Sequence, residues 1–213
     1  MKKFFMAALL MLAAGSAMAQ LVNSDDYFRL QVSYVGNQMT NTDNDPKGVA
    51  LGGIYGISVS DQIPLFVEIG AQLEWAHSVN DIWNTELTPT GNVYTRDDCK
   101  FTYMNISIPL NAAYKYTIND KVAVSGHAGL NFKVNMLAKQ KAFDTTLNLL
   151  DKDDMGGRDN RNIFQLGGQV GAGVHFGQLY LGWQYQGDFM PIAKFGNNKV
   201  KFHTNYVTVG FTL

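Results

Sequence analysis

Few residues of this 213-residue chain have the types and spacing that chemistry requires. His77 and Ser78, with Asp81 close behind, are the strongest candidates, because a histidine can take the proton of a serine nucleophile. His77 and Ser78 are neighbours in a segment that runs on from a predicted strand, and adjacent strand residues point to opposite faces. A lipid-modifying hydrolase or acyltransferase is therefore disfavoured, and we predict no enzyme and no catalytic residue.

Metal-binding patterns are also weak. The histidines lie apart, without metal-ligand spacing: His77, His127, His175 and His203. Asp43, Asp45 and Gly48 resemble the start of a calcium loop, but Ile54 stands where such a loop needs a glutamate. An acidic set in a later polar stretch is typical of a solvated loop: Asp151, Asp153, Asp154 and Asp159. We predict no metal and no cofactor.

The composition excludes some partners and favours strands. There are 17 basic and 18 acidic residues without a basic cluster, so nucleic acid is not an expected partner. The 21 glycines, 12% aromatic residues and only 5 prolines suit many strands joined by turns. The single cysteine, Cys99, can form no internal disulfide and is either a bystander or a thiol that reacts or pairs with another chain.

The first residues have the pattern of a secretory signal peptide. Lys2 and Lys3 precede an apolar run over residues 4–14, and Ala17 and Ala19 form an A-x-A cleavage site. We predict cleavage after Ala19, which divides the chain into a signal peptide, 1–19, and one domain, 20–213. No later apolar run is long enough for a membrane helix, so any membrane insertion must use strands.

The segment from residue 101 to 134 is the clearest structural signal. Apolar residues recur at every second position from Met104 to Tyr116 and again from Val122 to Val134, with a polar turn over 117–121 between them. The pattern predicts a long antiparallel hairpin. Each run covers about a dozen residues, close to the nine to eleven that a tilted strand needs to cross a bilayer.

The same alternation predicts eight strands, near residues 28–36, 49–59, 65–75, 104–116, 122–134, 164–176, 179–185 and 207–213. Connections after the second, fourth and sixth are short. The others are mostly long, and they define four predicted external loops: 39–47, 77–100, 135–162 and 188–199. Short turns on one rim and long loops on the other are typical of outer-membrane barrels. The predicted fold is an all-β, eight-stranded antiparallel up-and-down transmembrane β-barrel.

The two faces of these strands differ in charge. The apolar face of all eight contains no charged residue, which is what a lipid-facing surface requires. Aromatic residues near strand ends are candidates for interfacial girdles: Tyr34, Trp75, Tyr114 and Tyr116. The other face carries Arg29, Glu68, Glu74, Lys115 and Lys133. Eight strands enclose only enough space for side chains, so we predict a filled polar lumen in which each acid has a base or a hydrogen-bond partner.

Glycines within the second and sixth predicted strands lie inside strands and not before a helix, so a phosphate loop is disfavoured. We expect them to ease strand bending or to make room for large neighbours. They are Gly52, Gly53, Gly167, Gly168, Gly171 and Gly173.

Segment 103–116, the turn residues Asn119, Asp120 and Lys121, the strand up to Phe132 and the closing segment 206–213 resemble the porin-like outer-membrane β-barrel family of Gram-negative bacteria. The resemblance implies a small OmpA/OmpX-like barrel in the bacterial outer membrane, in contact with outer-membrane lipid. It also implies insertion by the barrel-assembly machinery, although Leu213 stands where the family's export signal usually has an aromatic residue. It supplies no family-wide active site.

The predicted function is a surface-interaction or envelope-structure role, in which the external loops contact an extracellular protein or another surface ligand. Apolar residues of the third loop could contact such a partner or pack on the loop itself: Phe143, Leu147, Leu149 and Leu150. A narrow diffusion pore is the alternative, and a lipid-modifying enzyme is less favoured. A soluble lipocalin-like carrier would require an apolar interior.

Overall fold

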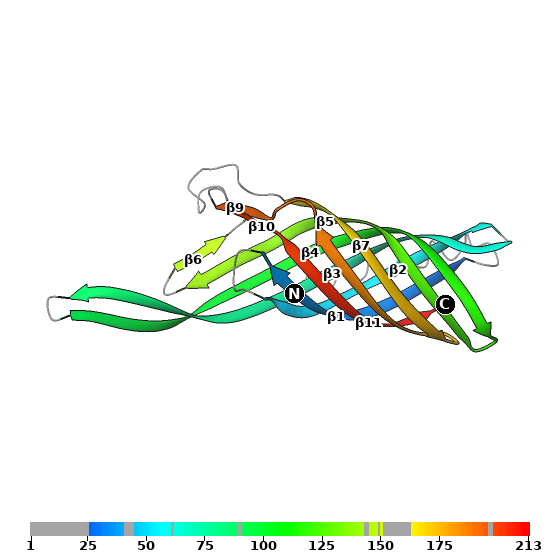
Figure 1. Ribbon diagram of the computed structural model, residues 1–213, viewed down its shortest axis with the longest axis horizontal. Helices are drawn as coiled ribbons and strands as arrows, with labels where there is room; N and C mark the ends of the chain where they lie inside the picture. The colour runs from blue at the N-terminus through cyan, green and yellow to red at the C-terminus, as the bar shows by residue number, and fades with distance from the viewer. Residues whose placement is uncertain are drawn as a thin grey trace, which may run out of the picture.

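A computed structural model describes residues 26–40, 45–60, 62–88, 91–142, 145–148, 150, 163–195 and 198–213, with side chains described outside 82–95 and 193–198. Eight long strands form the wall: β1 Tyr27–Met39, β2 Lys47–Ser60, β3 Ile63–Thr88, β4 Gly91–Asn119, β5 Val122–Ala142, β7 Phe164–Phe176, β8 Leu179–Asp188 and β11 Phe202–Thr212. Each pairs antiparallel with its neighbours in the order β4-β3-β2-β1-β11-β8-β7-β5, and β5 pairs with β4 to close the ring. The predicted eight-stranded barrel is confirmed (Figure 1).

Three short elements lie outside this ring. β6, Thr145–Asn148, pairs with the end of β5, while β9, Ala193–Phe195, and β10, Asn198–Val200, form a small hairpin of their own. Among the described residues, no helix is long and apolar enough to cross a membrane.

The three short turns lie at the predicted places and on one rim. In the β4–β5 turn, the Asn119 side-chain oxygen accepts hydrogen bonds from the backbone N–H groups of Lys121 and Val122, each 2.9 Å long. In the β7–β8 turn, Gly177 has φ 59°, a left-handed conformation that glycine adopts without steric cost. The start of β1 and the end of β11 lie side by side at the same rim, where the N–H of Leu213 donates a hydrogen bond to the carbonyl of Phe28.

On the opposite rim, β3 and β4 continue well beyond the barrel. They have 26 and 29 residues, far more than the nine to eleven that cross a bilayer. Pairing with β2 ends at Lys47↔His77 and pairing with β5 at Lys100↔Lys141, but β3 and β4 remain paired to Thr88↔Gly91. Figure 1 shows this hairpin extending away from the wall. We call residues 81–88 and 91–98 the projecting hairpin.

Three predicted loop boundaries are therefore wrong. Residues 77–100 are mostly strand, β5 runs on to Ala142 in the predicted third loop, and Asp188 ends β8 and lies inside the barrel. In the sequence of segment 77–100, polar residues occupy both odd and even positions, so the apolar alternation that marks a strand fades while the backbone ladder continues.

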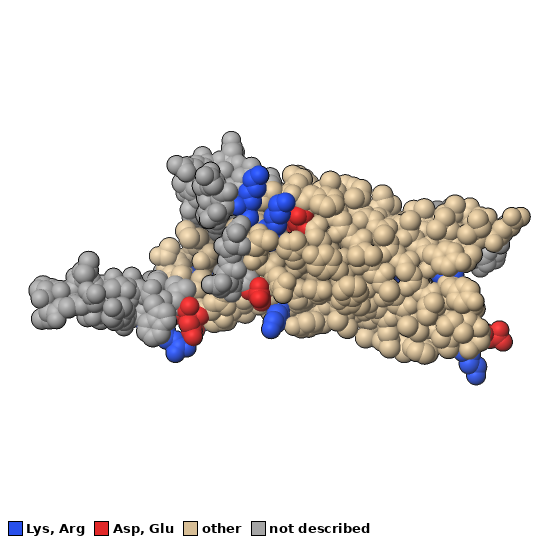
Figure 2. Space-filling model, viewed as in Figure 1, with Lys and Arg blue, Asp and Glu red and all other residues tan. Residues whose placement is uncertain are grey.

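The outward face of the wall is apolar and exposed, as predicted. Val32, Leu51, Leu110, Leu181 and Val209 are all between 41% and 53% exposed although they are aliphatic. In Figure 2 the middle of the wall is free of Lys, Arg, Asp and Glu, and the visible charges lie toward the ends. The predicted girdle residues are also exposed: Tyr34, Trp75, Tyr114 and Tyr116.

Two residues of the predicted outward face are buried instead. The Tyr55 hydroxyl donates to Asp26 at 3.0 Å, so the residue that precedes β1 lies over this ring. Leu73 on β3 lies opposite Leu51 of β2 on one side and Ile106 of β4 on the other, and its side chain is 8% exposed.

Glycines make room for aromatic rings inside the barrel, which confirms one of the predicted roles. A Cβ atom added to Gly173 or to Gly182 would lie 2.3 Å from the Tyr180 ring or its hydroxyl. The Tyr180 ring can therefore lie against both positions only because neither has a side chain.

Candidate functional site

The lumen near the short-turn rim contains a buried ion pair. The Arg29 guanidinium lies 3.4 Å from a Glu68 oxygen, and both side chains are almost fully buried. Glu68 also accepts hydrogen bonds from the Tyr27 hydroxyl and, at 3.3 Å, from the Asn111 amide. The guanidinium lies 3.9 Å from the centroid of the Tyr180 ring. Glu68 is thus compensated by a cation and two further donors, as a buried carboxylate must be.

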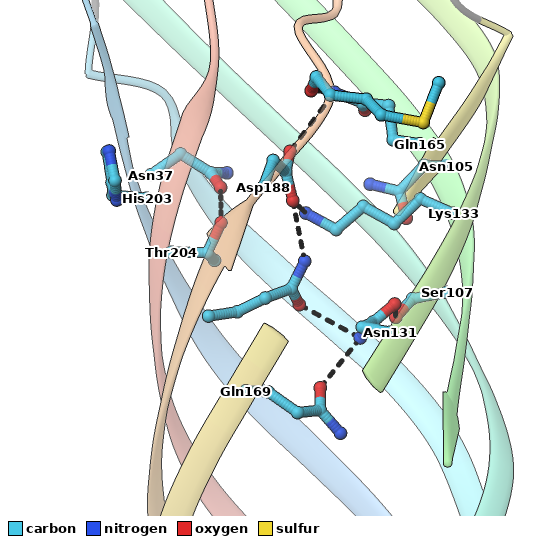
Figure 3. Close-up of polar contacts among 12 residues, drawn as sticks. Asn37, Asn105, Ser107, Asn131, Lys133, Gln165, Gln169, Asp188, His203 and Thr204 are labelled. Atoms are coloured by element: carbon cyan, nitrogen blue, oxygen red, sulfur yellow. Dashed lines mark hydrogen bonds and ion pairs between the residues drawn. The ribbon is translucent and has the colours of Figure 1, made fainter. Parts of the chain in front are cut away.

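Amide side chains fill the middle of the lumen (Figure 3). Asn131 donates to Gln169 at 2.9 Å and to Gln186 at 3.0 Å, and Gln169 donates to Asn111 at 2.5 Å. A cavity lined by Arg29, Glu68 and eight other residues measures about 10 Å³, which is room for about one water molecule. The prediction of a lumen filled by polar side chains is confirmed.

A second ion pair lies toward the loop rim. The Lys133 ammonium is 3.3 Å from Asp188, and both side chains are 1% exposed. Gln165 and Gln186 also donate to this carboxylate (Figure 3). The sequence identified Lys133 as a lumen charge but assigned its partner to a loop.

Glu74 has neutral partners. It accepts hydrogen bonds from Asn37 at 3.0 Å, from Asn105 at 3.1 Å and from the Tyr206 hydroxyl at 3.0 Å. The expectation that each buried acid has a base or a hydrogen-bond partner is therefore confirmed for Glu68 and for Glu74.

An apolar cluster closes the loop end of the lumen. We call it the apolar cap, and its buried residues are Ala76, Phe101, Tyr103, Ala138, Ile192, Val200 and Phe202, with Met39 and Leu150 packed against them. The rings of Tyr103 and Phe202 lie 4.7 Å apart. Of the apolar residues predicted in the third loop, Leu150 packs on the cap and Leu147 is 37% exposed. Phe143 and Leu149 lie outside the described residues.

His77 and Ser78 lie on opposite faces, as expected. The His77 ring faces outward, stacks beside Trp75 and shares a hydrogen bond of 3.1 Å with the Thr102 hydroxyl. Ser78 is buried on the inner side. Asp81 is held 2.5 Å from Arg96, and this hydrogen bond raises the pKa of the guanidinium. The three residues therefore form no catalytic arrangement.

The remaining histidines and Cys99 serve as hydrogen-bonding groups. His127, His175 and His203 contact Gln184, Ser125 and Tyr185, each a residue of the wall. Cys99 is buried and accepts a hydrogen bond from Gln140 at 3.2 Å. In the part of the chain that the structure describes, no group of three His, Cys, Asp or Glu residues could hold a metal ion. The acidic residues of 151–159 and Asp43 lie outside it.

A comparison of the sequence with protein families agrees with this architecture. The model of the outer membrane protein β-barrel domain matches residues 5–212, nearly the whole chain. The chain belongs to this outer-membrane β-barrel family. It is accordingly an integral protein of the bacterial outer membrane, whose apolar wall faces lipid and whose lumen is closed by its own side chains. No curated protein matches the sequence.

Solved structures of small outer-membrane barrels are similar to it. Neisserial surface protein A (NspA) has 14% identity and a TM-score of 0.49, with 89% of this chain and 97% of that chain covered. Ail of Yersinia pestis, in complex with the heparin analogue sucrose octasulfate, has 12% identity and a TM-score of 0.42, with 88% and 97% covered. OprG of Pseudomonas aeruginosa has 11% identity and a TM-score of 0.38, with 88% and 95% covered.

Proposed function

We propose that this barrel acts through its loop side, in surface interaction or envelope structure, and has no enzymatic role. The main support is the projecting hairpin. From Asp81 to Thr88, β3 pairs only with β4, and from Gly91 to Cys99, β4 pairs only with β3. Each strand of this segment therefore has an edge with no strand beside it among the described residues. Such edges can add an extended segment of a partner protein through main-chain hydrogen bonds.

The interior supports a role outside conduction. Polar side chains fill the lumen, and the apolar cap covers its loop end. A narrow diffusion pore would require a continuous water path past both. Planar-bilayer recording tests this alternative: we expect no steady conductance, and a stable open level would favour the pore.

Shortening the projecting hairpin tests the surface role. Deleting residues 83–96 and joining Ile82 to Asp97 through Asn-Gly keeps the native pairs Ile82↔Asp97 and Asp81↔Asp98 and supplies a tight turn. Cells that display this variant are compared with cells that display the wild type for adhesion to fibronectin-coated, laminin-coated and albumin-coated surfaces. We expect at least a fivefold loss of specific adhesion, at equal amounts of folded barrel in the outer membrane.

A deletion of residues 151–162, between β6 and β7, is the matched control. Loss of adhesion only in this control would show that the partner binds the third loop and not the hairpin. Wild-type adhesion in both variants, or no specific adhesion by the wild type, would contradict the surface-interaction proposal.

We also propose that residues 1–19 are a signal peptide and that the barrel-assembly machinery inserts the domain of residues 20–213. The basic start, apolar run and A-x-A site support export. N-terminal sequencing of the protein from outer membranes is expected to begin at Gln20. Depletion of the barrel-assembly machinery is expected to prevent its appearance there.

A further inference from the structure

Three lysines project outward from neighbouring strands on the loop side of the wall. They are Lys100 on β4 and Lys139 and Lys141 on β5, and all three are exposed. Lys100 lies directly opposite Lys141, and Thr102 lies opposite Lys139. A bulge at Met104/Asn105 sets this register, since it turns Ala138 and Gln140 inward and leaves the two β5 lysines on the outer face.

The lysines lie just above the lipid-facing wall. Two pairs below Thr102↔Lys139 is Met104↔Leu137, and Met104 is also paired with Trp75 on β3. Trp75 is 44% exposed, as an interfacial aromatic residue is. The ammonium groups therefore lie where hydrocarbon gives way to lipid headgroups.

The arrangement is unfavourable without an anion. Side chains directly opposite in an antiparallel pair have Cβ atoms about 5 Å apart, and like charges there repel each other. Among the described residues, the one acid that pairs with the three lysines is Asp98, 3.8 Å from Lys100 and itself exposed. On β6, the positions opposite Lys139 and Lys141 are the neutral residues Asn148 and Thr146.

We propose that Lys100, Lys139 and Lys141 bind a phosphate-bearing headgroup of an outer-leaflet lipid. A phosphate between the three ammonium groups would cancel their repulsion, and lysine is well suited to a phosphate as a compact point charge. A lipid fits better than free phosphate because its acyl chains would lie on the apolar wall directly below.

The short-turn rim lacks this arrangement in its described part. Its exposed lysine, Lys121, follows Asp120 in a turn and has no lysine opposite it. The site is therefore specific to the external side, which distinguishes the two leaflets.

Lipid retention by the whole barrel tests the proposal. Barrels are purified in detergent, mixed with equal amounts of diphosphoryl lipid A and phosphatidylcholine, and examined by native mass spectrometry. The variant Lys139→Gln/Lys141→Gln is compared with wild type and with Lys121→Gln/Lys199→Gln, which removes the same charge elsewhere. We expect the wild type and this control to retain lipid A over phosphatidylcholine, and the first variant to retain about tenfold less lipid A, since each surface lysine contributes several-fold to anionic lipid binding.

The proposal would be overturned if Lys139→Gln/Lys141→Gln retained as much lipid A as the control Lys121→Gln/Lys199→Gln. Equal retention of lipid A and phosphatidylcholine by the wild type would also overturn it. A third arm adds inorganic phosphate at 10 mM: unchanged lipid A retention supports a lipid site, whereas complete displacement would show a site for free phosphate and overturn the lipid assignment. Heat-modifiable gel migration of each variant confirms that it is folded.

Discussion

The two faces of the same strands have opposite chemistry within the membrane. Val32 and Val209 are about half exposed on the outside, while Gln31 and Thr208, one residue away on the same strands, are buried in the lumen. In a water-soluble protein, the apolar set would be inside. The difference shows that the two faces of each strand match two environments: hydrocarbon outside the wall and a polar, side-chain-filled lumen inside it.

The largest expected effect comes from breaking the inner face at Arg29. Arg29→Met leaves the Glu68 carboxylate buried without its cation, which is expected to cost about 3 to 5 kcal/mol in the free energy of unfolding. Urea unfolding of the barrel in phosphatidylcholine vesicles measures it. The double variant Arg29→Met/Glu68→Leu removes both charges and is expected to recover most of the loss. Equal instability of the single and double variants would contradict the ion-pair explanation.

The next effect concerns the apolar cap. Phe202 is fully buried there, so Phe202→Ala is expected to reduce the free energy of unfolding by about 3 to 4 kcal/mol. Conductance in planar bilayers is expected to stay absent, because the amide network below the cap still fills the lumen. A steady channel in this variant would show that the cap alone keeps the lumen closed.

A smaller effect separates the lipid-facing wall from the level just above it on the same outer surface. Val209→Arg places a charge on the lipid-facing wall and is expected to cost about 2 to 4 kcal/mol, whereas the matched change Val79→Arg, beyond the wall, is expected to cost about 0 to 1 kcal/mol. Val209 and Val79 are 52% and 50% exposed, so exposure does not distinguish them. Equal costs in vesicle unfolding would mean that both residues face the same solvent.

The smallest effect is expected at the exposed ion pair between Arg96 and Asp81. Arg96→Met removes it, but both side chains are about half exposed, and water replaces the lost contact. We expect no measurable change in urea unfolding. A loss of unfolding free energy as large as that of Arg29→Met would contradict the expectation that exposed ion pairs stabilise the barrel less than buried ones.

Much of the wall could be predicted from the sequence because lipid imposes a strict alternation on it. The alternation predicts the strands and the three short turns. It also predicts that residues such as Ile106 and Leu130 face outward and that Glu68 faces the lumen. Lys133 could be placed inside, but Asp188 could not be recognised as its partner, because it is close in space and distant in sequence.

The parts that escaped prediction lie where this constraint ends. The sequence of the projecting hairpin has polar residues at both odd and even positions, so it is typical of a loop, although the backbone pairing continues to Thr88↔Gly91. Phe101, Tyr103 and Phe202 face inward among polar positions, and only the closed barrel brings them together as a cap. The lysine cluster likewise depends on a bulge that shifts the register of β5 by one residue.

Spin-label accessibility at the outer face tests the membrane orientation most directly. A spin label is placed at Val209→Cys in a Cys99→Ser background, and the reconstituted barrels are exposed in turn to oxygen, which concentrates in hydrocarbon, and to a water-soluble nickel chelate. A label at Arg96→Cys, an exposed position on the projecting hairpin, is the reference in water. A lipid-facing wall predicts strong relaxation of the Val209 label by oxygen and little by nickel, with the opposite result for the label at position 96. Strong relaxation of the Val209 label by nickel would contradict the membrane-spanning barrel.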